Sequence, residues 1–126
     1  MEKTRDQIKE EKAALRKLKA ASKKESREQA RSLLEEKGAP KSCEYCGINE
    51  EDFPRVWGKF YDGNRGKRLE PDHKDNDYRN NGLENLCWAC SLCNCAKSNK
   101  LTHKEMIEVG AVIKTIWQKK LSAHIA

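Results

Sequence analysis

The sequence lacks long hydrophobic runs. No stretch approaches the roughly 18 consecutive apolar residues of a membrane-spanning helix. Residues 1–20 also contain no apolar segment of the kind found in secretory signal peptides. These absences argue against a membrane protein and against export, so we expect an intracellular, cytoplasmic protein.

Apolar residues are few overall, and charged residues make up 37% of the 126-residue chain. There is room for one domain with a small core, which usually needs an additional stabilising element such as bound metal. Lys and Arg number 26 against 20 Asp and Glu, giving a net charge of +6. This excess fits a polyanionic partner such as nucleic acid, and equally a chain that is merely soluble.

Proline and glycine are absent from residues 2–37, which are rich in good helix formers. Thr4 and Gln7 have the spacing of a capping box, and Gly38 followed by Pro40 is a stop signal. The pattern predicts one long helix, or two helices broken near Ser22. We expect residues 1–38 to be a basic helical extension and residues 39–126 to be the main domain.

This N-terminal segment is strongly basic between positions 12 and 27. It could follow a phosphate backbone, or be a solvated helix with one narrow docking stripe. Its apolar positions are too sparse for a sustained coiled-coil seam. The candidate DNA-binding residues, including two from a later basic stretch, are Lys12, Arg16, Lys17, Lys19, Lys23, Lys24, Arg27, Arg65 and Arg68.

Cysteine is used in closely spaced pairs. Cys43 and Cys46, followed by Gly47, resemble a zinc knuckle, although a lone Cys-x-x-Cys could equally be a redox pair. The downstream cysteines are Cys87, Cys90, Cys93 and Cys95. In a reducing compartment, paired motifs favour metal ligation over disulfides. Two overlapping downstream pairs leave the choice of ligands open on spacing alone.

Two further segments contain hydrophobic residues at helical spacing. Phe53, Val56, Trp57, Phe60 and Tyr61 recur at a helical period, and we interpret them as core and not as base-stacking residues. After a Thr102/Glu105 capping box, apolar residues again recur at helical spacing. This pattern predicts a C-terminal amphipathic helix that packs Trp117 on the core. His103, at its start, has no spacing that indicates ligation.

Residues 67–100 predict a strand, a loop, a strand and a helix. The strands are expected over residues 67–72 and 84–89, and the helix from Ser91 or Cys93 to Lys100. The loop between the strands is acidic, but its spacing does not fit an EF-hand calcium site. This unit contains Asp72-His73, then Asn85, then Asn94 directly after Cys93, and then Lys97.

On these motifs, residues 43–101 resemble the HNH endonuclease family, also called ββα-metal nucleases. The zinc-bearing branch, which includes phage endonucleases of the endonuclease VII type, looks similar. The resemblance implies a small α+β fold: a ββα-metal core stapled by a four-cysteine zinc site, flanked by the two long helices. The resemblance implies that the zinc ligands are Cys43, Cys46, Cys90 and Cys93. With this choice Asn94 directly follows the last zinc ligand, as it does in the family. Cys87 is then a buried residue and Cys95 a spare thiol.

The resemblance also implies roles. His73 is the general base, and Asp72 and Asn94 hold one Mg²⁺ or Mn²⁺. Asn85 braces the loop that carries His73, and Lys97 faces the phosphate. The expected activity is hydrolysis of DNA to 5′-phosphate and 3′-hydroxyl ends. Asn94 stands where many members have His, which should weaken selection for Zn²⁺ or Ni²⁺.

A non-catalytic zinc ribbon that binds nucleic acid or a protein is the alternative. The Asp-His, Asn and Asn set favours the nuclease, because a structural ribbon does not need it. One ββα unit holds one active site, so double-strand cleavage would need a homodimer or two sequential nicks. The target and the pathway, whether phage restriction, packaging or recombination, remain open.

Overall fold

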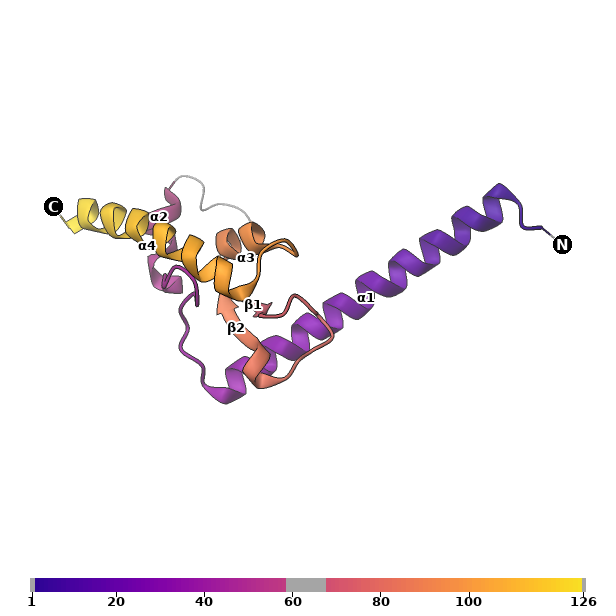
Figure 1. The fold of residues 1–126 in the computed structure, drawn as a ribbon, viewed down its shortest axis with the longest axis horizontal. Coiled ribbons are helices and arrows are strands. Elements are labelled where there is room, and N and C mark those ends of the chain that lie inside the picture. The colour runs from indigo at the N-terminus through magenta and orange to yellow at the C-terminus, as the bar shows by residue number, and fades with distance from the viewer. Residues whose placement is uncertain (1, 59–67, 126) are drawn as a thin grey trace.

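The computed structural model describes residues 2–58 and 68–125 as a small domain with one long projecting helix (Figure 1). The predicted positions Phe60, Tyr61 and Arg65 lie outside the described residues. None of the described helices is both long and apolar enough to cross a membrane. The helices and strands are α1 (Arg5–Lys37), α2 (Phe53–Trp57), β1 (Glu70–His73), β2 (Leu86–Ala89), α3 (Ser91–Lys97) and α4 (His103–Ile125), with short 3₁₀ turns at Glu50–Asp52 and Leu83–Asn85.

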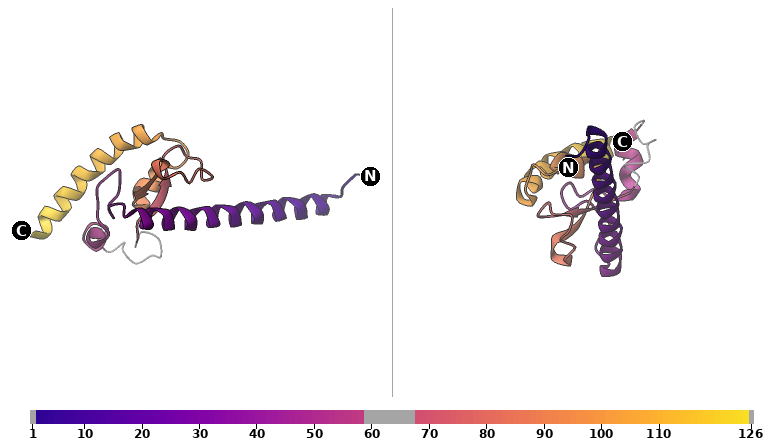
Figure 2. Two further views of the ribbon diagram at one scale, coloured as in Figure 1. Left: turned by 90° about the horizontal axis from the view of Figure 1, so that it is seen from below. Right: turned by 90° about the vertical axis from the view of Figure 1, so that its right-hand side faces the viewer.

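Helix α1 is one unbroken helix, so a break near Ser22 does not occur. The Thr4/Gln7 capping box is present, and Gly38 ends the helix in the left-handed conformation with φ of 70°. At 1.5 Å per residue α1 is about 50 Å long. Its first two-thirds project from the domain, whereas Ala30 and Leu34 are buried in the core (Figure 2).

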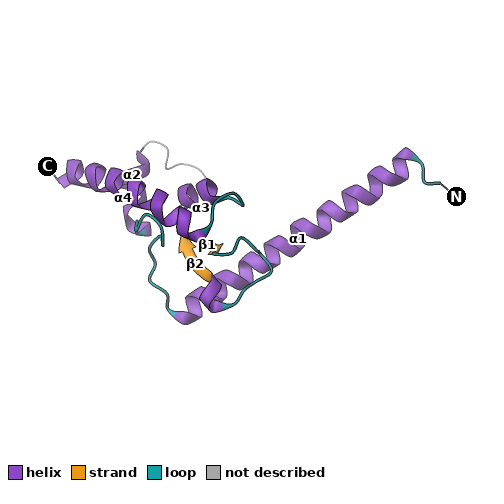
Figure 3. Ribbon diagram, in the orientation of Figure 1, coloured by secondary structure: helices purple, strands orange, loops and turns teal. Residues whose placement is uncertain are grey.

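The strands β1 and β2 form an antiparallel pair between α1 and the helices α3 and α4 (Figure 3). The register pairs Asp72 with Cys87 and His73 with Leu86. β2 begins two residues later than expected, because Leu83–Asn85 forms a 3₁₀ turn. α3 ends at Lys97, before the expected Lys100. The predicted strand, loop, strand, helix order is confirmed.

Helix α4 covers the zinc-knuckle segment and α2. Trp117 is buried and meets Trp57 edge-on, with ring centroids 5.1 Å apart, as the core interpretation predicts. Gly110 lies against the Tyr45 backbone, where an added Cβ would come within 2.2 Å of the Tyr45 carbonyl oxygen. Only glycine therefore allows α4 to cross this close to the knuckle.

Candidate active site

Four cysteine side chains meet in the core. The sulfur atoms of Cys43, Cys46, Cys90 and Cys93 lie within 4.8 Å of one another, and all four residues are buried. Cys46 and Cys90 have sulfurs 3.6 Å apart. A tetrahedral Zn²⁺ with Zn–S bonds of about 2.3 Å would separate its sulfurs by about 3.8 Å. The cluster therefore fits a structural zinc ion.

The backbone around these sulfurs has the form of two matched turns. Amide groups of Cys46 and Cys93 point at the sulfurs of Cys43 and Cys90, at 3.5 and 3.4 Å. Hydrogen bonds with Cys46 and the other thiols lower the pKa of Cys43, whereas contact with Cys43 raises the pKa of Cys93. Four thiols this close cannot all ionise without a cation, so the donor set calls for a metal.

The two other cysteines are separate from the cluster. Cys87 is buried, and burial together with the charge of Asp72 raises its pKa to about 12, so it stays a neutral thiol. Cys95 is exposed on α3. None of the six cysteines forms a disulfide.

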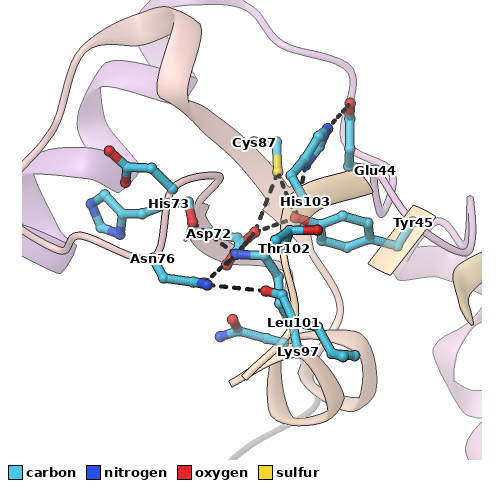
Figure 4. A network of polar contacts seen from close by, with 12 residues as sticks. Glu44, Tyr45, Asp72, His73, Asn76, Cys87, Lys97, Leu101, Thr102 and His103 are labelled. Carbon is cyan, nitrogen blue, oxygen red and sulfur yellow. Dashed lines mark hydrogen bonds and ion pairs between the residues drawn. The ribbon is translucent and has the colours of Figure 1, made fainter. Parts of the chain in front are cut away.

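A cleft of about 590 Å³ opens beside the sheet and holds the predicted catalytic residues. Asp72 and His73 enter it from β1, and Asn94 enters from α3. Successive residues of a strand point to opposite faces. Figure 4 accordingly shows the His73 ring directed away from the Asp72 carboxylate. Helix α1 also lines the cleft, through Lys23 and Arg27.

Asp72 is held in a buried polar network. Its Oδ2 accepts from the Tyr45 hydroxyl at 2.5 Å, and both of its oxygens lie 3.4 Å from the Lys97 ammonium. Burial, and then the contact with Asp72, raises the pKa of Tyr45, so its hydroxyl stays protonated and donates. The Oδ1 atom accepts from Lys97 Nζ, and Asp72 is also one of the residues that line the cleft.

Lys97 does not occupy the expected place. Its side chain is fully buried, and Nζ donates to the His73 carbonyl at 2.9 Å and to Asn76 Oδ1 at 2.5 Å, besides its contact with Asp72 (Figure 4). The expectation that Lys97 faces a phosphate therefore does not match its position. The ammonium instead ties β1 and the loop after it to α3.

Asn94 has its carboxamide orientation fixed. A carboxylate only accepts hydrogen bonds, and Glu70 Oε1 lies 2.8 Å from Asn94 Nδ2. The Asn94 carbonyl oxygen is consequently the atom left for a cation. One carboxylate oxygen from Asp72 and one amide oxygen from Asn94 suit Mg²⁺, which keeps most of its shell for water and phosphate.

Asn85 is nearly buried and joins both ends of the loop between the strands. Its side chain accepts from the Asp75 amide at 3.1 Å, and donates to the Asp75 carboxylate and the Asn80 carbonyl at 2.9 Å. The backbone carbonyl of Asn85 accepts from the Lys74 amide at 2.8 Å. These bonds fix the loop that follows His73. The acidic residues of this loop stabilise its turns: the carboxylates of Asp75 and Asp77 each accept from the backbone amide two residues later in the chain.

The basic candidates on α1 are exposed, and only some reach the cleft. Lys23 and Arg27 line it, and Lys23 lies 5.6 Å from the ring centre of Tyr78. Arg68 is exposed just before β1 but is not among the residues lining the cleft. The other basic candidates on α1 are exposed and do not line the cleft: Lys12, Arg16, Lys17, Lys19 and Lys24.

Several site residues had no sequence signal. Tyr45 lies between Cys43 and Cys46, and the spacing of these cysteines indicated only a metal site. The Tyr45 hydroxyl also lies 3.0 Å from Nδ1 of His103, a residue for which the sequence indicated no role. Burial lowers the pKa of His103, which keeps the ring neutral. One signal could have indicated the buried Lys97: it lies four residues after Cys93 on α3, and therefore on the same inward face.

Comparison with known proteins gives one informative match. No family model and no curated protein matches the sequence. Among solved structures, the rare-cutting HNH restriction endonuclease PacI, which is described as perturbing DNA, superposes with a TM-score of 0.56. The match covers 78% of this chain and 80% of that chain at 23% sequence identity. It does not bear on the resemblance to endonuclease VII, which stays a prediction.

This likeness and the four-cysteine cluster agree with the architecture expected from the motifs. At this identity, the superposition speaks for the fold alone. The chain is a small α+β protein that shares the fold of an HNH restriction endonuclease.

Proposed function

We propose that the protein is a metal-dependent HNH endonuclease that hydrolyses DNA phosphodiester bonds. The observation that carries this proposal is the shared cleft. His73, Asp72 and Asn94 line it together with two cationic residues of α1, Lys23 and Arg27. A structural zinc ribbon has no need for this set of groups.

Each group has a role that follows from its chemistry. His73 takes a proton from a water molecule positioned for attack on phosphorus. Asp72 and Asn94 would hold one Mg²⁺ or Mn²⁺, which would supply the positive charge that neutralises the phosphate and stabilises the leaving oxygen. Two residues keep the backbone of His73 in place. Asn85 binds the loop that follows His73, and Lys97 donates to the His73 carbonyl.

Helix α1 provides a route for the DNA backbone. Five basic residues recur every three or four positions and share one face, which we call the basic stripe: Lys12, Arg16, Lys19, Lys23 and Arg27. The same spacing continues into the buried Ala30 and Leu34, so the stripe faces the side on which the domain lies. It extends about 22 Å and ends at the cleft. A duplex lying along it would present a phosphate to His73.

The zinc cluster is built from different residues than the cleft, so zinc binding alone would also fit a non-catalytic DNA-binding ribbon. A nicking assay separates the two. With Mg²⁺ or Mn²⁺, the zinc-loaded protein should cut supercoiled plasmid or a branched duplex, and removal of the divalent ion should stop it. Protein that binds these DNAs but cuts none of them with any divalent metal would favour the ribbon.

A further inference from the structure

Asn81 connects the imidazole of His73 to helix α1. Its Oδ1 atom lies 2.7 Å from His73 Nε2. Its Nδ2 atom lies 3.2 Å from both the carbonyl and the hydroxyl oxygen of Ser26, and 3.1 Å from Gln29 Oε1. Ser26 also donates its hydroxyl hydrogen to the Tyr78 carbonyl. Residues 55 positions apart are thus joined at the edge of the cleft.

These contacts determine which way the Asn81 amide faces. A backbone carbonyl can only accept, so the group that meets the Ser26 carbonyl must be the amide NH₂. The Asn81 oxygen is then the atom that faces His73. An amide oxygen cannot donate, so the hydrogen of this bond belongs to His73 Nε2. In the neutral ring, Nδ1 is therefore the bare nitrogen that can accept a proton.

We propose that Asn81, oriented by Ser26 and Gln29 of α1, is a positioning residue that holds His73 in its Nε2–H tautomer with Nδ1 free as the base. The inference rests on the proposed function, and it gives the part of α1 around Ser26 and Gln29 a role in the reaction besides DNA binding. It differs from the role of Asn85, which contacts the backbone of the loop and not the imidazole.

The arrangement leaves Asn81 little freedom for another task. Both of its side-chain polar atoms are used, one by His73 and the other by α1. Ser26 is only partly exposed, and its hydroxyl is used by Tyr78 and Asn81. A DNA phosphate only accepts hydrogen bonds, so it could bind the Asn81 amide group only by displacing Ser26 or Gln29.

The test replaces Asn81 with Leu, which keeps the size and removes both polar atoms. Turnover by the zinc-loaded protein should fall about 10- to 100-fold, the usual effect of losing an orienting partner. KM for plasmid DNA and zinc content should stay unchanged. Ser26→Ala, which leaves the Ser26 carbonyl, should show a smaller loss in kcat. Ser22→Ala, one turn earlier on the exposed part of α1, is the matched control and should behave as wild type.

A spectroscopic measurement tests the tautomer without relying on cleavage. In ¹⁵N-labelled protein at mildly alkaline pH, the His73 signals, assigned by their loss in His73→Ala, should show protonated Nε2 and bare Nδ1. Asn81→Leu should convert them to averaged signals of two tautomers. Wild-type protein with the hydrogen on Nδ1, or an unchanged pattern in Asn81→Leu, would overturn the proposal. If wild-type protein cuts no DNA, the proposed function fails, and this comparison still decides the role of Asn81.

Discussion

Replacing Lys97 by Met tests the buried network beneath the cleft. The substitution keeps the aliphatic bulk of the side chain but removes an ammonium that is 0% exposed and contacts a carboxylate that is 7% exposed. Removing one partner of a buried ion pair leaves the other charge unpaired, which costs about 3–5 kcal/mol. The bonds to the His73 carbonyl and to Asn76 are lost as well. At roughly 4 °C per kcal/mol for a domain of this size, Tm should fall by about 12–20 °C.

The assay is thermal and urea unfolding of zinc-loaded protein at fixed zinc concentration. Lys100→Met is the matched control, because Lys100 is exposed just after α3, and it should change stability by no more than about 0.5 kcal/mol. Adding Asp72→Asn to Lys97→Met should cost less than the two single losses together, because the unpaired charge is then gone. If Lys97→Met unfolds like the control but has weaker DNA binding with a lower salt dependence, Lys97 contacts phosphate and the network is misassigned.

Three further predictions follow from the metal sites and the basic stripe. Purified protein should contain about one Zn²⁺ per chain, and metal analysis that finds no zinc would refute the role of the cluster. Cys46→Ser and Cys93→Ser should unfold the domain, whereas Cys87→Ser and Cys95→Ser should retain zinc. Asp72→Ala and Asn94→Ala should lose cleavage that high Mg²⁺ or Mn²⁺ partly restores, and a variant that cuts normally at low Mg²⁺ would remove that residue from the metal site. Replacing Lys12, Arg16 and Lys19 by Gln should reduce the slope of log DNA affinity against log salt by about 2.7. The same change at three lysines of α4, Lys104, Lys114 and Lys119, should leave the slope nearly unchanged. Equal slopes for the two triple variants would show that α1 does not follow the DNA backbone.

Local spacing predicted much of the molecule. Cys43 and Cys46 share one turn, as do Cys90 and Cys93, so each pair could be predicted to aim two sulfurs at one point. The Asp72-His73 pair at the end of a strand needed no knowledge of distant contacts. The helical boundaries of α1 followed from Thr4 and Gly38, because caps act within a few residues.

The remaining features depend on contacts between distant segments. The meeting of Ser26 with Asn81 spans 55 positions, and no periodicity encodes it. The spacing of Lys97 from Cys93 indicates an inward-facing side chain, but its partner Asp72 lies 25 positions earlier in the chain and meets it only in the folded protein. Tyr45 donates to Asp72 from 27 positions away, and Gly110 of α4 lies against the Tyr45 backbone; neither contact can be predicted from spacing.

The most direct test of the account is the rate at which His73→Ala cuts DNA. His73 is assigned to proton transfer and to neither metal, so the variant should keep its zinc, its Tm and its affinity for plasmid DNA. Its single-turnover cleavage with Mg²⁺ should fall about 10²- to 10⁴-fold, the usual worth of a general base. Raising Mg²⁺ or Mn²⁺ should not restore it. If wild-type protein nicks plasmid and His73→Ala nicks it equally fast, His73 is not the base and the mechanism proposed for this cleft is wrong.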